Sequence, residues 1–282
     1  MSSDTLSPAE ATISVSKRNI AIAELVIFSL IHIIQLSIRY MQEWKYWHHR
    51  KRQCLPRCFL YSWFSMVGIL SQIRIASSAM ILSTSTPTES MLIAESSLQS
   101  VGLSPLMFEI SLVLLRCGQA GEHGPGNSKY PKSLRIMMHG FRFFVAIAVV
   151  LGVVGGIIKM PALGKAGSIV LIVVFAYVCG LVSWLSVKFR TILTLAGHRG
   201  ILLTSCALPF LLVRIIYFLL LEFGPPKFNP AYGNVAILAG MGLLMEITVV
   251  AWLMAARTVA EPISGSTGMK HITSVDEEQP RN

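Results

Sequence analysis

Three residues in the last third of the chain have the types and spacing of a polar site inside a membrane. Arg214 and Tyr217 lie three residues apart in one apolar run, so a helix there places both on one face. Pro209 precedes them and removes a backbone hydrogen bond, which can bend this helix and turn that face toward its neighbours. Glu246 lies in the next apolar run. A guanidinium, a phenol and a carboxylate can bind an anionic head group or pass a proton to an apolar substrate.

Further ionisable residues are expected at a similar depth. By the helical rise, Glu24 lies about 8 Å, and Arg74 and Arg214 about 12 Å, from the same end of their spans. Glu95 enters the third span from that end at a similar level. A charge at the bilayer centre costs at least about 2.5–3.5 kcal/mol, so each of these residues needs a partner or a water-filled cavity.

Arg214 carries the sharpest expectation. Its guanidinium stays charged and lies too deep to reach the surface easily. We therefore expect it to face the bundle interior with Tyr217 and to reach the carboxylate of Glu24, Glu95 or Glu246.

A second, deeper group of polar residues is expected near the middle of the membrane. It contains Glu246 in the last span, Glu109 in the third and His32 in the first. Buried polar groups of this kind also serve to fix helix packing by pairing with one another, and this alternative stays open for both groups.

The elements that hold these residues are transmembrane helices. The chain has 282 residues, of which 53% are apolar and 13% charged, against about 25% charged in a typical soluble domain. The apolar residues form blocks of 20 or more, long enough to cross about 30 Å of hydrocarbon. This composition excludes an ordinary soluble enzyme and predicts an all-α, polytopic membrane protein.

Seven spans are expected, separated by Pro- and Gly-containing breaks. They run from about Asn19 to Tyr40, Arg57 to Leu82, Glu89 to Cys117, Leu134 to Ile158, Ala166 to Val187, Gly200 to Glu222 and Ala231 to Ala256. The third contains several polar residues together with Gly102 and Pro105, so it is expected to be kinked.

The basic residues predict the orientation. With the amino terminus outside, sixteen Lys and Arg fall on the cytoplasmic side and five on the other. Residues 1–18 are expected to be a disordered outer segment, 19–257 the seven-helix domain, and 258–282 a disordered cytoplasmic tail.

The same charge pattern bears on partners. The net charge is +10, but the bases sit mainly in short loops beside spans, where they contact anionic lipid, so no nucleic acid partner is expected. The five cysteines have no regular spacing. No close set of His, Cys and carboxylate ligands occurs, so neither a metal nor a cofactor is expected.

The chain resembles a family of seven-helix membrane proteins of filamentous fungi that is classified as a domain of unknown function. The residues that carry the resemblance are Pro-x4-Arg-x2-Tyr from Pro209, Phe228-Asn229-Pro230, Gly233, Met241-x3-Met245-Glu246, Glu24-Leu25-Val26, Ile73-Arg74-Ile75 and Gly102-Leu103-Ser104-Pro105-Leu106. The resemblance covers about residues 20–258. Ala76-Ser77-Ser78 departs from the family pattern, which has a glycine soon after the arginine. The resemblance implies the topology and a fungal source rather than an activity.

The expected function is binding or transport of a small amphipathic or lipid-like molecule, in the setting of fungal secondary metabolism. The candidate ligand-binding residues are Glu24, Arg74, Glu95, Glu109, Arg214, Tyr217 and Glu246. Two alternatives stay open: a membrane enzyme such as a terpene cyclase or isomerase, and a seven-helix sensor with a cytoplasmic protein partner. Membrane lipids are expected partners in each case, and the sequence does not distinguish plasma membrane from endomembrane.

Overall fold

The structure is a computed structural model that describes residues 15–49, 55–83, 98, 102–119, 130–158, 160–188, 190, 193–224 and 235–260. This described part is helical and contains no strand. Its elements are α1 (Val15–His49), α2 (Leu55–Trp63), α3 (Met66–Ser83), α5 (Leu103–Cys117), α6 (Lys132–Ile157), α7 (Pro161–Lys188), α8 (Leu195–Phe223), α9 (Val235–Ile237), the π-helix η3 (Leu238–Leu244) and α10 (Met245–Ala260).

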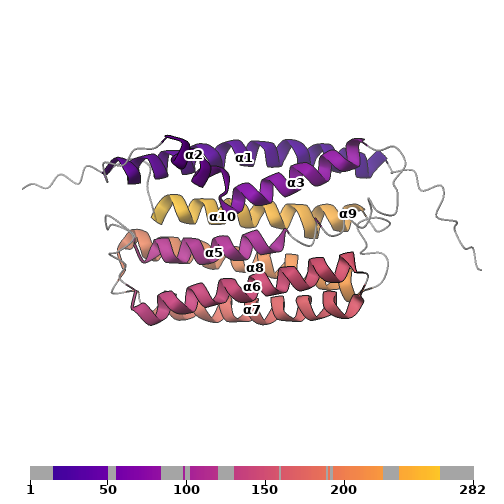
Figure 1. The fold of residues 1–282 in the computed structure, drawn as a ribbon. Coiled ribbons are helices and arrows are strands. Elements are labelled where there is room, and N and C mark those ends of the chain that lie inside the picture. The colour runs from indigo at the N-terminus through magenta and orange to yellow at the C-terminus, as the bar shows by residue number, and fades with distance from the viewer. Residues whose placement is uncertain are drawn as a thin grey trace, which may run out of the picture.

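The helices form an elongated bundle in layers (Figure 1). At one edge, α1 packs on α2 and α3, and at the other, α6 packs on α7. Between these edges lie α5, α8 and α10, and α10 packs most extensively on α8. The short helix α5 is central, because it contacts α3, α6, α8 and α10.

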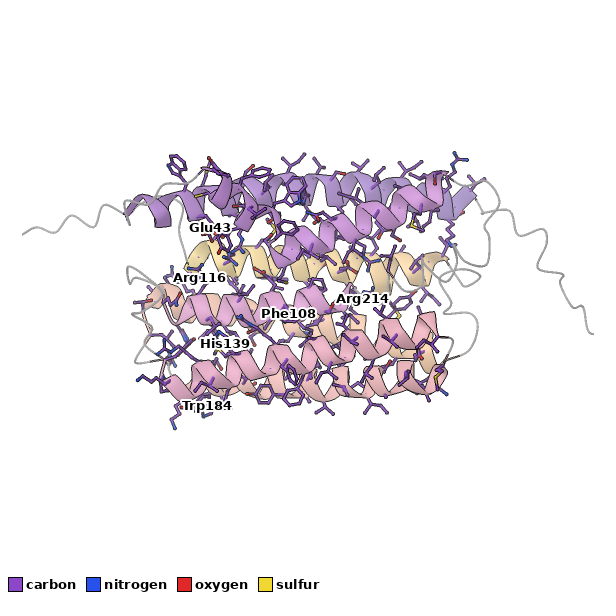
Figure 2. All side chains as sticks on the ribbon, in the orientation of Figure 1. Glu43, Phe108, Arg116, His139, Trp184 and Arg214 are labelled. Carbon is purple, nitrogen blue, oxygen red and sulfur yellow. The ribbon has the colours of Figure 1, made fainter. Side chains whose placement is uncertain are left out.

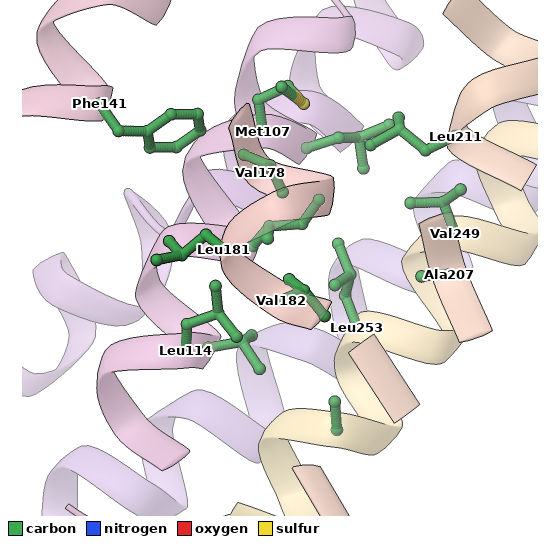
Figure 3. Packing of buried hydrophobic residues seen from close by; sticks show 14 of the residues in the cluster. Met107, Leu114, Phe141, Val178, Leu181, Val182, Ala207, Leu211, Val249 and Leu253 are labelled. Carbon is green, nitrogen blue, oxygen red and sulfur yellow. The ribbon is translucent and has the colours of Figure 1, made fainter. Parts of the chain in front are cut away.

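The apolar core lies where α5 meets its neighbours. Figure 3 shows Met107 and Leu114 of α5 beside Val182 of α7, Leu211 of α8 and Leu253 of α10. These side chains are almost completely buried. Burial of apolar side chains on several faces of α5 gives it a fixed position, so the polar residues that it carries are held firmly as well.

In the part of the chain that the structure describes, six helices are long and apolar enough to cross a membrane. They are Val15–Trp44, Met66–Ser83, Lys132–Gly155, Ala162–Lys188, Leu195–Phe223 and Val235–Ala260. Large apolar side chains such as Ile136, Phe143 and Val187 are exposed on the outside of the bundle, where lipid is the favourable surrounding. The protein is therefore a multi-pass membrane protein in contact with lipids.

The third predicted span differs from the others. Of its range Glu89–Cys117, the structure shows α5, which has 15 residues and is about 22 Å long. Residues 89–97 lie outside the described residues. Helix α5 alone is shorter than the roughly 30 Å of hydrocarbon, and the count of seven spans stays a prediction.

The second predicted span is not one continuous helix from 57 to 82, because α2 and α3 are separated at Ser65. Its hydroxyl oxygen accepts a hydrogen bond from the Gly68 N–H (3.1 Å), as an N-cap does, and its O–H donates to Gln35 Oε1 (2.6 Å). A Cβ on Gly68 would lie 2.7 Å from the carbonyl oxygen of Trp63. The break between α2 and α3 thus coincides with a contact between Ser65 and α1.

The helical part also extends beyond the predicted transmembrane domain. Helix α1 begins at Val15 rather than Asn19, and α10 ends at Ala260 rather than before residue 258. The 35 residues of α1 make it about 52 Å long, so it is longer than the membrane is thick.

Candidate functional site

The first polar cluster is built around Arg74 of α3. Its Nε donates to Glu246 Oε1 (2.7 Å), and its Nη2 forms an ion pair with Glu246 Oε2. The third nitrogen, Nη1, lies 3.5 Å from Glu24 Oε1. A two-point contact between a guanidinium and a carboxylate is among the stronger polar contacts in proteins. Arg74 therefore connects α1 to α10 through two carboxylates.

Arg214 of α8 joins the same cluster from the other side. Its Nε lies 3.2 Å from Glu246 Oε2, and its Cζ lies 5.3 Å from the centroid of the Tyr217 ring. Arg74 is 3% exposed, Arg214 2% and Glu246 0%. Two arginines thus share one fully buried carboxylate, and Tyr217 lies over one of them.

The local structure around Glu246 is unusual. The seven residues of η3, which include Gly240 and Gly242, form a π-helix that ends directly before α10. Such segments are rare and occur frequently at functional sites. Gly242 packs near Tyr217, because a Cβ there would lie 3.6 Å from the tyrosine ring. The last helix thus changes its winding one residue before it presents Glu246.

A glycine makes room for the central arginine. A Cβ added to Gly102, just before α5, would lie 2.8 Å from Arg74 Nη2. Because that nitrogen is bound to Glu246, the guanidinium cannot move away without losing an ion pair. We expect Gly102→Ala to lower the free energy of unfolding by about 1–3 kcal/mol, measured from the midpoint of SDS-induced unfolding in mixed micelles.

Gly180→Ala in α7 is the matched control, since nothing lies within 4 Å of a Cβ at that position. Alanine is the better helix former, so this variant should be as stable as the wild type or more stable. Equal stability of the two variants would show that space beside Arg74 is not limiting.

A second polar cluster lies farther along α1 and α10 and includes a residue of α5. Arg257 Nη1 donates to Glu109 Oε1 (2.9 Å) and Arg257 Nε donates to Gln42 Oε1 (3.3 Å). All three side chains are buried. Nearby, Arg116 pairs with Glu43 at 3.8 Å, and Figure 2 places this pair and Arg214 toward opposite ends of the bundle.

Two helices carry pairs of polar residues with the same spacing. Glu246 of the first cluster and Arg257 of the second are eleven residues apart on α10, as are Glu24 of the first cluster and Gln35, which contacts Ser65, on α1. Eleven residues are close to three turns, so each pair lies on one helix face about 16 Å apart. Fully buried apolar side chains lie between the clusters along these helices, namely Phe28, Leu70 and Leu253.

A small cavity adjoins the second cluster. Its volume is about 20 Å³, and its lining residues are Gln35, Ile38, Arg39, Ser65, Val67, Glu109, Met254 and Arg257. Among the described residues, three buried polar atoms of this lining have no hydrogen-bond partner: Gln35 Nε2, Arg39 Nε and Glu109 Oε2. The accessible surface of the cavity is almost entirely apolar, with contributions from Ile38, Val67 and Met254, because these three polar atoms are covered by their neighbours.

The structure confirms the expectation for Arg214, which is buried and reaches Glu246. Glu24, Arg74 and Tyr217 lie in the same cluster. Glu246, which was expected in a second group, also belongs to this cluster. An arginine side chain is long enough to reach a group at another depth in the bundle. A depth estimated from residue positions along the helix axes does not include this reach.

Two further residues of the predicted groups, Glu109 and His32, lie elsewhere. Glu109 does not meet Glu246 but pairs with Arg257. The ring of His32 meets the ring of Trp63 edge-on, with centroids 5.0 Å apart. Glu95 lies outside the described residues.

Arg257 is not among the predicted site residues, because it lies just after the last predicted span, which ends at Ala256. The sequence does contain a signal, since Arg257 follows Glu246 by eleven residues. A helix that runs through both residues places them on one face. Gln35 and Gln42 were also missed, since neutral amides stand out less than charges in an apolar run. Among the described residues, no group of three or more His, Cys, Asp and Glu could hold a metal ion.

Comparison with known proteins shows the family. A family model described as a domain of unknown function, DUF7702, matches residues 15–261, a range that includes every described residue of both clusters. The chain matches no curated protein and no solved structure. Since the match covers most of its length, the chain belongs to the DUF7702 family.

Proposed function

We propose that the protein binds a small amphipathic or lipid-like molecule, or moves it across the membrane. The cavity beside Glu109 supports this proposal, because its surface is almost entirely apolar and charged and amide side chains are among its lining residues. A ligand with one polar end and an apolar body matches such a lining. The cavity also lies beside α1, α3 and the segment Val235–Ala260, which are long enough to span a membrane, so a lipid-soluble ligand can reach it from the bilayer.

The first cluster has a supporting role in this proposal. Glu24, Arg74, Arg214 and Glu246 satisfy one another's charges, and the cluster joins α1 and α3 to α8 and α10. It holds together the two sides of the bundle between which the cavity lies. For transport, these ion pairs would break and form again as the ligand passes.

The topology that accompanies this function is also a proposal. The residues before α5 would complete a seventh span, with the amino terminus outside and the carboxyl terminus in the cytoplasm, as the basic residues indicate. We place the protein in a fungal membrane, following the resemblance of the sequence, and its ligand in secondary metabolism as part of this proposal.

Binding is favoured over proton-transfer catalysis by the surroundings of the acids. A general acid needs a carboxyl group that keeps its proton in an apolar pocket. Instead, Glu246 lies between two arginines and Glu109 contacts Arg257. Such pairing suits a site that holds a polar group in place more than one that donates a proton.

The test is ligand binding and flux with the full chain in phosphatidylcholine vesicles, using a mixed panel of radiolabelled fatty acids, long-chain alcohols, amines and phospholipids. We expect saturable binding or flux of at least one compound, reduced about tenfold or more by Glu109→Gln. Glu43→Gln is the matched control, because Glu43 pairs with Arg116 outside the cavity lining. Identical curves for wild type and Glu109→Gln across the panel would overturn the proposal.

A further inference from the structure

Two exposed contacts between a lysine and an aromatic ring mark the boundaries of the hydrocarbon layer. Lys165 of α7 lies over the ring of Phe223, 5.7 Å from its centroid. Lys188, near the other end of α7, lies 5.4 Å from the centroid of the Trp184 ring. Lysine side chains extend toward the head groups, and tryptophan collects at that level. Lys165 and Trp184 are 19 residues apart, about 28 Å along the helix, which matches the roughly 30 Å of hydrocarbon.

The second cluster lies at the level of the boundary that is opposite Phe223. Arg214 precedes Phe223 by nine residues on α8, so it lies about 13 Å from the first boundary. Arg214 contacts Glu246, and Arg257 lies about 16 Å farther along α10, which runs toward the other end of the bundle (Figure 1). Arg257 and its partner Glu109 are therefore about 30 Å from the first boundary, where the hydrocarbon ends and the head groups begin.

The carboxylates at this level already have partners. Arg257 pairs with Glu109 at 2.9 Å, and Arg116 pairs with Glu43 at 3.8 Å. The other acids of the described residues lie in the first cluster or beside Gly164 at the opposite end, namely Glu24, Glu246 and Glu222. The described part of the chain thus supplies no further negative charge here.

Two more arginines bring positive charge to the same place. Arg39 of α1 and Arg142 of α6 interact electrostatically with Glu109, as Arg116 of α5 does. Arg142 Nε donates to the hydroxyl of Ser111 (2.9 Å), which is a neutral group. Four arginines and two glutamates leave an excess of two positive charges. Beside hydrocarbon, such an excess is costly unless an anion compensates it.

The arginines are accessible from the membrane. The side chains of Arg39 and Arg142 are half-buried, and that of Arg116 is 28% exposed. Phe143 and Phe144 directly follow Arg142 and are exposed on the outside of the bundle, where acyl chains lie. A phospholipid uses both features, because its head group reaches the arginines while its chains cover the apolar surface. A free phosphate ion would use only the first.

Charge selects the head group. Guanidinium groups bind phosphate oxygens through paired hydrogen bonds. A phosphate monoester carries about −1.5 to −2 charges at pH 7, which matches the excess. The choline group of phosphatidylcholine would instead add a positive charge beside the arginines. In the proposed topology this end faces the cytoplasm, and the cytoplasmic leaflet contains the anionic lipids.

We infer that Arg39, Arg116 and Arg142 bind the head group of an anionic phospholipid that ends in a phosphate monoester, at the surface of α1, α5 and α6. This inference goes beyond the proposed function, because such a lipid belongs to the surrounding membrane and does not enter the cavity. The two can fail separately. Unchanged binding of the mixed panel in Glu109→Gln would overturn the proposed function and leave the phosphate site standing.

The experiment measures lipid binding to the full chain in detergent micelles by native mass spectrometry. Three lipids with identical acyl chains are compared: phosphatidic acid, phosphatidylglycerol and phosphatidylcholine. For the wild type, we expect a Kd for phosphatidic acid at least about tenfold lower than for phosphatidylcholine, with phosphatidylglycerol between them. A large excess of inorganic phosphate should not displace the lipid. Equal Kd values for the three lipids, or displacement by inorganic phosphate, would overturn the inference.

A double variant assigns the selectivity to the site. Replacing both Arg39 and Arg142 by Gln should raise the Kd for phosphatidic acid about tenfold or more and leave that for phosphatidylcholine unchanged. Lys132→Gln with Arg190→Gln is the matched control, because it removes two exposed charges at the same end of the bundle, at the start of α6 and after α7. An equal rise in both double variants would show general attraction to a basic surface and overturn the site. The comparison of lipids in the wild type does not depend on how either variant folds.

Discussion

Replacing Glu246 by Gln is expected to lower the free energy of unfolding by about 3–5 kcal/mol, the range measured when one partner of a buried ion pair is removed. Arg74 and Arg214 both contact this carboxylate, and both are almost completely buried. In the variant, Glu24 alone would face two positive charges. The measurement is the midpoint of SDS-induced unfolding in mixed micelles, together with the yield of monodisperse protein.

Two further variants test the cause of this loss. Glu43→Gln makes the same chemical change at a less buried ion pair, and it should cost less than about 1 kcal/mol. The double variant Glu246→Gln with Arg214→Gln removes one charge of each sign, so its loss should be smaller than the sum of the two single losses. Additive losses would contradict the shared ion pair as the source of the effect.

Arg74→Met is expected to be the second most damaging change, at about 3–4 kcal/mol, and clearly more damaging than Arg214→Met. Removing Arg74 leaves Glu24, which is only 6% exposed, without its ion-pair partner, and takes two hydrogen bonds from Glu246. Removing Arg214 takes from Glu246 one contact at 3.2 Å, and Glu246 keeps both of its contacts with Arg74. We expect about 1–2 kcal/mol in that case.

Methionine is the substitute in both variants because it keeps an unbranched apolar chain of similar length, so the comparison isolates the charge. The same unfolding measurement ranks the two. An equal loss, or a larger one for Arg214→Met, would show that Arg74 is not the centre of the cluster.

The ion pairs also explain how the bundle is held together. Helices α1 and α3 form one side of the bundle, and α8 and α10 form another. Arg74 of α3 binds Glu246 of α10, and Arg257 of α10 binds Gln42 of α1, so both arginines link the two sides. In lipid, association of helices receives no hydrophobic contribution, so packing and polar contacts carry it. Loss of an ion pair should therefore loosen the contact between these two sides first.

The sequence by itself determined the class of this protein. Blocks of 20 or more apolar residues can be stable only as helices in lipid, since every backbone polar group needs a partner there. The same reasoning required Arg214 to lie inside the bundle, because an arginine neither loses its charge nor reaches water from that depth. These conclusions depend on length, composition and the cost of isolated charges, which are all local properties of the chain.

Only the tertiary structure decided which partner each charge meets. Arg74 and Glu246 are 172 positions apart, and their contact depends on how helices rotate and slide against one another, which a hydrophobic pattern leaves undetermined. The break at Ser65 requires Gln35, 30 positions away, and the burial of Arg257 requires that α10 continue past the expected end of its span. The cavity beside Glu109 likewise exists only because side chains from α1, α3, α5 and α10 leave space between them, and space between helices is a property of packing that no single segment encodes.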